Sequence, residues 1–137
     1  MCLNKKSLLA GLAAGLAILV LSFAFEALVQ LAFPYKWAEL GAIRDLKDPL
    51  MLAFFLHPFV MGLVAAVVYE KVGRRFRGDW KQRGLKLGQL LWLVAAVPEA
   101  YIIYTSMTYP MGFYVSLVVG YFVYYTAAGL VVARLTK

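Results

Sequence analysis

Residues 87–107, LGQLLWLVAAVPEAYIIYTSM, decide the fold class, because they form an apolar run of membrane-spanning length with an acidic residue inside it. Pro98 and Glu99 lie side by side near its middle. A carboxylate in hydrocarbon costs about 2.5–3.5 kcal/mol on insertion scales, so neighbouring helices must shelter it. The stretch therefore predicts a polytopic membrane protein with a polar position among its helices.

The composition of the whole chain agrees with this class. The 137 residues are 64% hydrophobic and only 15% charged, and the mean hydropathy is +0.77. Such a chain is too apolar for a soluble domain of this size and has little polar sequence for a second domain. We therefore expect an all-α integral membrane protein, in the cytoplasmic membrane of a prokaryotic cell. Residues 1–137 should form one four-helix bundle with spans at about 8–33, 50–69, 87–107 and 112–133.

Small residues and a carboxylate share one face of two predicted helices. At 100° per residue, one face of the first helix, within about 60°, carries Gly11, Gly15, Ser22 and Glu26. The same projection of the third helix groups Gly84, Gly88, Ala95, Glu99 and Ser106. Small residues let helix backbones approach closely in a membrane, so both carboxylates should point at a neighbouring helix.

The last apolar run carries a similar row at four-residue spacing: Gly112, Ser116 and Gly120. This row predicts a seat for a neighbouring helix, either of the same subunit or of a second copy. Tyr121 should lie deep enough in the same helix for its hydroxyl to need a hydrogen-bond partner.

Basic residues are distributed unevenly along the chain. Eleven of the fourteen lie near the two ends and in the segment 70–86, and the other three lie in the segment 35–49. The positive-inside rule then predicts four spans with both termini cytoplasmic. The segment 70–86 is also a candidate for contact with anionic lipid headgroups, although topology alone explains its charge. Because membrane orientation accounts for the surplus, we expect no nucleic-acid partner.

In the predicted outer loop, 35–49, apolar residues recur every three positions: Trp37, Leu40, Ile43 and Leu46. This spacing predicts a short amphipathic helix at the membrane surface, with a solvated loop as the alternative. Asp48 followed by Pro49 is typical of a helix start, so the second span should begin near residue 49.

The second span contains the only histidine, His57, directly before Pro58. A proline frees a backbone carbonyl one turn back, which predicts a kink with a polar partner nearby. His57 is a candidate for that partner or for a ligand-binding group, and a neutral imidazole hydrogen-bonded inside the bundle is the alternative.

Depth suggests that three ionisable side chains belong together. A rise of 1.5 Å per residue puts Glu26 about 9 Å, His57 about 4–5 Å and Glu99 about 3 Å from the middle of their spans, all toward the outer side. They are therefore candidates for one ligand-binding or proton-binding pocket, joined by the tyrosines Tyr101, Tyr104 and Tyr121. The alternative is that each satisfies a backbone group freed by a nearby proline.

Two carboxylates and an imidazole suit proton-coupled transport of a small polar or cationic ligand or ion, because burial raises the pKa of a carboxylate toward neutrality. They also suit a divalent metal, although the sequence contains no Glu-x-x-His pair and does not define the metal. No phosphate-binding loop, GxSxG motif or HExxH motif is present, so a catalytic role has no motif behind it and no cofactor is indicated.

Four spans in a short chain, with Glu26 in the first, resemble the architecture of the small multidrug resistance transporters. The resemblance covers the helix count and this glutamate, which here lies late in its helix beside an added carboxylate, a histidine and a long outer loop. The alternative function is a non-catalytic accessory or assembly subunit, with further copies or other membrane subunits as partners. Carboxylates that face a water-connected cavity would favour transport, and carboxylates closed by hydrogen bonds to neighbouring helices would favour the subunit.

Overall fold

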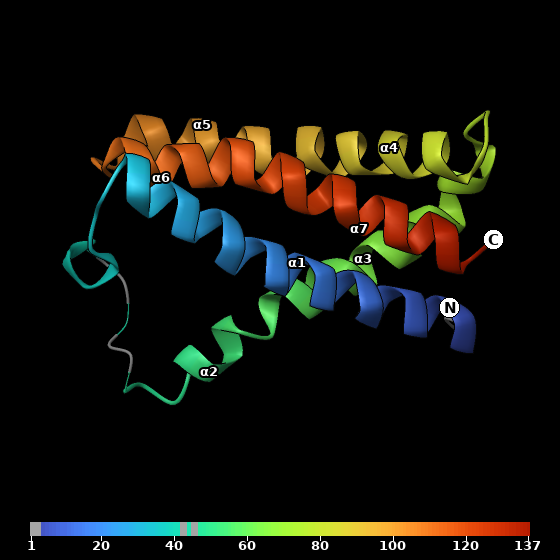
Figure 1. Ribbon diagram of the computed structural model, residues 1–137, viewed down its shortest axis with the longest axis horizontal. Helices are drawn as coiled ribbons and strands as arrows, with labels where there is room; N and C mark the ends of the chain where they lie inside the picture. The colour runs from blue at the N-terminus through green and yellow to red at the C-terminus, as the bar shows by residue number, and fades with distance from the viewer. Residues whose placement is uncertain (1–3, 42–43, 45–46) are drawn as a thin grey trace.

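The computed structural model describes residues 4–41, 44 and 47–137 (Figure 1). Within this part of the chain the regular structure is helical, and four helices are long and apolar enough to cross a membrane. They are α1 (Lys5–Ala32); α2 (Met51–Phe54) with α3 (His57–Lys71); α4 (Trp80–Leu91) with η3 (Trp92–Ala96) and α5 (Val97–Ser106); and α6 (Met111–Val115) with η4 (Ser116–Gly120) and α7 (Tyr121–Leu135). The all-α class with four membrane-length helices is confirmed.

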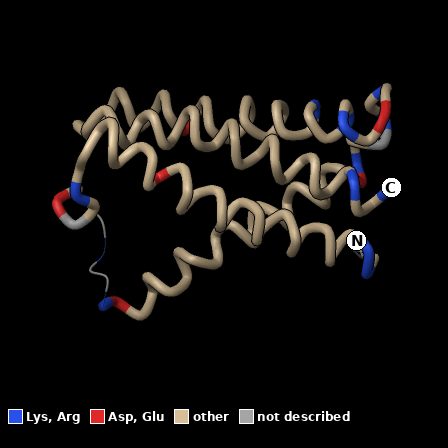
Figure 2. Tube along the Cα trace, in the orientation of Figure 1, with Lys and Arg blue, Asp and Glu red and all other residues tan. Residues whose placement is uncertain are grey.

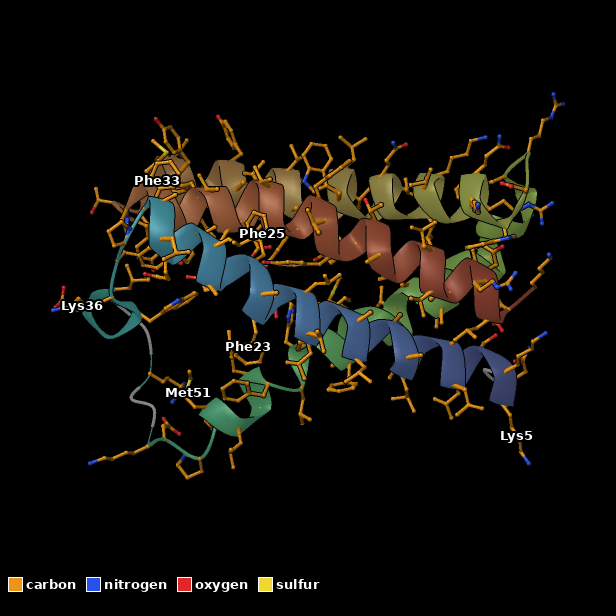
Figure 3. All side chains as sticks on the ribbon, viewed as in Figure 1. Lys5, Phe23, Phe25, Phe33, Lys36 and Met51 are labelled. Carbon is orange, nitrogen blue, oxygen red and sulfur yellow. The ribbon has the colours of Figure 1, made fainter. Side chains whose placement is uncertain are left out.

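The helices α1 and α7 form the central pair of the molecule (Figure 1). The helix α3 packs on α1 and α4 packs on α7, whereas α3 and α4 touch only slightly. Phe25 of α1 points toward α7 and meets the Tyr124 ring edge-on, and Phe23 points toward α2, where it stacks on Phe55 (Figure 3). α2 diverges from α1 at the end away from the termini, so the helices are most tightly packed at the end that holds both termini (Figure 1).

The tightly packed half has a core of small side chains. Its fully buried hydrophobic residues include Ala10, Ala14, Ala65, Ala66, Leu87, Ala128, Val132 and Ala133. Short side chains let the helix axes approach one another. At two places the approach is so close that only glycine fits. An ideal Cβ on Gly62 of α3 would lie 2.2 Å from the carbonyl oxygen of Gly11 on α1. One on Gly129 of α7 would lie 2.3 Å from the carbonyl oxygen of Gly84 on α4.

The third membrane-length helix begins at Trp80, well before the predicted start at residue 87. Asp79 caps it, because its carboxylate accepts a hydrogen bond of 2.9 Å from the Gln82 N–H. Hydropathy detects only the apolar part of a helix, and the first two turns of α4 are polar and basic. Much of the predicted basic loop is therefore helical, and the connection between α3 and α4 is short, with a 3₁₀ turn, η2 (Gly73–Arg75).

The same helix changes its phase in the middle. Residues Trp92–Ala96 form a π-helical turn just before Pro98, which has no backbone N–H to donate. A π-turn holds one extra residue, so it rotates the following residues by about 100° relative to an uninterrupted α-helix. The glycines before the turn stay against α7, but Glu99 after it is exposed. The prediction that small residues and carboxylate share one packing face is therefore wrong beyond the π-turn.

The second membrane-length helix is interrupted where its proline predicts a kink. α2 ends at Phe54 and α3 begins at His57, with Pro58 in the first turn. Between them the Phe55 N–H bonds the Leu52 carbonyl oxygen at 3.2 Å, which is the tighter 3₁₀ spacing. The helix is thus interrupted where the kink is predicted, without the predicted bond from His57.

In the described part of the long connection after α1, residues Trp37–Glu39 form a 3₁₀ turn, η1. The two later apolar positions of the predicted amphipathic helix, Ile43 and Leu46, lie outside the described residues, so that helix stays a prediction. Asp48 accepts a hydrogen bond of 2.9 Å from the Leu50 N–H, just before α2 begins at Met51. This bond and the Arg44 guanidinium hold the pKa of Asp48 below its usual value.

Candidate functional site

Glu26, in the second half of α1, is the most densely hydrogen-bonded side chain of the described residues. Its Oε1 accepts from the Tyr35 hydroxyl at 2.7 Å, from Gln30 Nε2 at 2.9 Å and from Trp37 Nε1 at 3.1 Å. Its Oε2 accepts from the Ser116 hydroxyl at 2.7 Å. An ionised carboxylate has about four acceptor positions, so donors of this chain use the capacity of Glu26.

Local sequence explains how three of these donors reach Glu26. Gln30 is one helical turn further along α1, on the same face. Pro34 lies just beyond the helix end, and the chain folds back so that the Tyr35 N–H donates to the Gln30 side-chain oxygen at 3.1 Å. Burial, together with the neighbouring Glu26 carboxylate, raises the pKa of Tyr35, so its hydroxyl stays a proton donor across the physiological range.

The fourth donor joins this cluster to the other half of the molecule. Ser116 opens the π-helical turn η4, and it lies in the Gly/Ser row that predicts a seat for a neighbouring helix. The occupant of that seat is the end of α1 in the same chain: an ideal Cβ on Gly112 would lie 2.6 Å from the Phe33 carbonyl oxygen. The Trp37 ring packs on Phe113 at 6.0 Å between centroids. Glu26 therefore joins α1, the connection that follows it and η4.

Glu99 has a different environment. Its side chain is exposed on α5, and within the described part of the chain no hydrogen bond or ion pair reaches its carboxylate. It lies within electrostatic reach of two α7 tyrosines, Tyr121 and Tyr125. The other predicted site tyrosines of this helix, Tyr101 and Tyr104, are 71% and 68% exposed, and the Tyr104 ring meets Tyr114 of α6 edge-on at 5.3 Å between centroids. The carboxylate thus faces outward from a membrane-length helix.

His57 is also exposed, at the start of α3, and among the described residues its imidazole has no hydrogen-bond partner. It therefore does not bond the carbonyl freed by Pro58. The structure does not bring Glu26, His57 and Glu99 into one hydrogen-bonded group, because the half-buried Glu26 bonds its own neighbours and the other two are exposed. Nor do the described residues contain a group of three His, Cys, Asp or Glu side chains that would hold a metal ion.

Aromatic side chains of α7 lie between the two glutamates. Tyr124 is within electrostatic reach of Glu26, and Tyr121 and Tyr125 are within reach of Glu99. The Tyr121 ring lies 5.9 Å from Tyr124 and 5.4 Å from Tyr125 between centroids. Tyr124 and Tyr125 are only 5% and 3% exposed, so this row of rings is part of the helix packing.

The two π-helical turns are adjacent and directly bonded. The Trp92 Nε1 of η3 donates to the Val118 carbonyl oxygen of η4 at 2.8 Å. π-turns often occur at functional positions in helices. Here one turn opens with Ser116, which bonds Glu26, and the other precedes the exposed Glu99.

Comparison of the chain with protein-family models, with curated proteins and with solved structures gives no match. The functional argument therefore rests on the geometry of these groups. That geometry provides one enclosed carboxylate with a structural set of donors and one outward-facing carboxylate on a membrane-length helix.

Proposed function

We propose that this protein is a non-catalytic assembly subunit of the membrane, which associates laterally through the outward face of α5. The observation that carries the proposal is the exposed carboxylate of Glu99 on a helix of membrane-spanning length. A carboxylate left in hydrocarbon costs about 2.5–3.5 kcal/mol, so a polar partner at the same depth favours association. Leu93, Val94 and Ile102 surround this part of the helix with exposed apolar surface.

Glu26 supports a structural role over transport. A carboxylate that exchanges protons with a substrate must be open to that substrate, whereas the oxygens of Glu26 already accept from four donors of three different elements. Such a carboxylate holds helices and loop together, as expected of a subunit that presents a rigid surface to a partner.

The partner that fits the chemistry is a second copy of the chain. Away from the basic ends of the described spans, the exposed ionisable groups other than tyrosines are an acid, Glu99, and a base, His57. At a rise of about 1.5 Å per residue, Glu99 lies about 9 Å from the centre of Trp80–Ser106. His57 lies about 6 Å from the centre of Met51–Lys71, toward the same end of the molecule. Because the membrane-length helix that carries Glu99 packs on α7 through α4, and α3, which begins with His57, packs on α1, copies placed side by side would bring His57 of one copy to Glu99 of the next.

Cysteine cross-linking tests this arrangement directly. In a Cys2→Ser background, a mixture of His57→Cys and Glu99→Cys chains should form disulfide dimers in vesicles. The matched control is a mixture of Leu31→Cys and Glu99→Cys chains, because Leu31 is also highly exposed but lies on α1. Equal cross-linking of the two mixtures, or a purely monomeric wild-type protein at every concentration, would contradict the proposal.

Loss of the carboxylate should weaken the association. We expect Glu99→Leu to lower the dimer association constant at least tenfold and Glu99→Gln, which still forms hydrogen bonds, to lower it less, as measured by native mass spectrometry in detergent. Glu39→Gln is the control, because Glu39 is an exposed acid that pairs with Lys36 in the outer loop. An unchanged dimer fraction in Glu99→Leu would refute the role of this residue.

Transport of a lipophilic cation is a second candidate, which the tyrosines beside Glu99 favour. A carboxylate next to aromatic rings attracts organic cations, and Tyr121 and Tyr125 are within electrostatic reach of Glu99. Tetraphenylphosphonium is a suitable probe. Saturable binding to the wild type but not to Glu99→Gln would support transport, and the absence of binding by both proteins would favour the assembly subunit alone.

We further infer that both termini are cytoplasmic. Figure 2 shows that Lys and Arg gather at the end of the molecule that holds both termini, and the middle of the helices is nearly free of charge. This distribution supports the orientation that the positive-inside rule predicts. A membrane-impermeant thiol reagent added outside should label a cysteine introduced at Ala42 and spare one at Arg77. The reverse labelling would refute the orientation.

A further inference from the structure

A pocket opens at the end of the molecule that holds both termini, between the end of α3, the start of α4 and the end of α7. Its lining includes Tyr69 of α3, Trp80 and Arg83 of α4, and Thr136 and Lys137 beyond α7. It lies outside the Glu26 cluster and the outward face of α5, and it shares no residue with either. We propose that this pocket binds the phosphate group of an anionic phospholipid.

Tyr69 is the first observation that points to a ligand. Its side chain is only 4% exposed and lines the pocket, and its hydroxyl, which stays accessible, accepts or donates no hydrogen bond within the described residues. A phosphate oxygen in the pocket would accept the hydrogen bond that the protein leaves unmade.

Arg83 supplies the second element of a phosphate site. Its Nε donates to the Gly78 carbonyl oxygen at 2.9 Å, which holds the guanidinium at the mouth of the pocket. That bond uses one of five N–H donors, so the two η nitrogens are available for the paired contacts that guanidinium makes with phosphate. The side chain is half-buried, which reduces the number of positions that its head can occupy.

The charge around the pocket favours an anion. The Arg134 guanidinium and the Lys81 ammonium lie 5.0 Å and 5.8 Å from the centre of the Trp80 ring. The one acidic side chain in the lining, Asp79, already accepts the Gln82 N–H as the cap of α4. The basic groups therefore dominate the potential at the pocket.

The depth of the pocket identifies the source of the phosphate as lipid. α4 and α7 leave their apolar stretches here, and a tryptophan flanked by basic residues is typical of the headgroup level of a membrane. Phosphodiester groups of lipids are concentrated at that level, and anionic lipids attract basic residues by about 1 kcal/mol each. The general contact with anionic headgroups that the sequence predicts for residues 70–86 is thereby narrowed to one pocket.

Native mass spectrometry of the full chain, released from micelles that contain phosphatidylglycerol or phosphatidylcholine, tests the assignment. We expect a one-to-one phosphatidylglycerol adduct and at least fivefold weaker retention of phosphatidylcholine. Arg83→Gln and Tyr69→Phe should each weaken the phosphatidylglycerol adduct at least fivefold. Arg77→Gln removes the same charge from the neighbouring loop outside the pocket lining, and it should leave the adduct unchanged.

Three results would overturn the proposal. Equal weakening by Arg83→Gln and Arg77→Gln would show that only the overall charge matters. Equal retention of the two lipids would remove the selectivity for an anion. Displacement of phosphatidylglycerol by inorganic phosphate at low millimolar concentration would identify the ligand as free phosphate and not lipid. Far-ultraviolet circular dichroism of each variant shows whether it keeps the wild-type helix content, so a folding defect is recognised separately.

Discussion

Gly62→Ala tests the packing of α3 on α1 with the smallest change that the chain allows. The added Cβ would lie 2.2 Å from the Gly11 carbonyl oxygen and 2.4 Å from the Gly15 backbone nitrogen. Ordinary contacts of a Cβ begin near 3.4 Å, so the two helices must separate by about 1 Å. Backbone atoms have no rotamer to change, and the strain cannot be relieved by moving a side chain.

The expected loss of stability follows from two opposing terms. Overpacking of a well-packed interior costs about 1–3 kcal/mol, and a clash with backbone atoms belongs at the upper end of that range. Replacing glycine by alanine in a helix returns about 1 kcal/mol of helix propensity. We therefore expect Gly62→Ala to lower the free energy of unfolding by about 2 kcal/mol.

Reversible unfolding with sodium dodecyl sulfate in mixed micelles, followed by circular dichroism, measures this difference. Gly41→Ala is the matched control, because an ideal Cβ on Gly41 meets nothing within 4 Å. The control should change the unfolding free energy by less than about 0.5 kcal/mol, as exposed substitutions usually do. If the two variants are equally stable, close backbone contact does not hold α3 on α1.

Two further variants test the polar groups. Tyr35→Phe removes a donor at 2.7 Å from the Glu26 carboxylate and should lower the free energy of unfolding by about 1.5–3 kcal/mol in the same micelles, whereas Tyr101→Phe, at an exposed position, should leave it unchanged. Pro98→Ala restores a backbone N–H and should convert the π-turn to α-helix. A spin label on Glu99→Cys should then become less accessible to oxygen dissolved in the micelle. Unchanged accessibility would show that the proline does not set the helix phase.

The helices of this protein are predictable from sequence because hydropathy and proline act locally. An apolar run of about twenty residues is long enough to span a bilayer whatever surrounds it. Pro58 interrupts its helix because of its own missing N–H and ring. Hydropathy does not detect the beginning of α4 at Trp80, because the first turns of this helix are polar. The capping residue Asp79 can nevertheless be recognised in the sequence.

The polar contacts are less predictable because they depend on distant segments. Gln30 is a partner of Glu26 that the one-turn spacing reveals. Ser116 lies 90 residues further along the chain. Its position in a row of small residues predicts a contact with another helix, but it does not predict which side chain of that helix is the partner. Tyr35 and Trp37 come from an irregular segment after Pro34, for which neither periodicity nor hydropathy gives a direction.

The contrast between the two glutamates comes from helix phase and not from composition. Glu26 lies in α1, which is a continuous α-helix from Lys5. The 100° projection therefore puts Glu26 on the side that meets another helix, where Ser116 bonds it. Glu99 follows a π-turn, so the same projection is wrong by one residue and the carboxylate faces outward. An inserted residue in one helical turn therefore separates a carboxylate that stabilises this chain from one that is available to a partner.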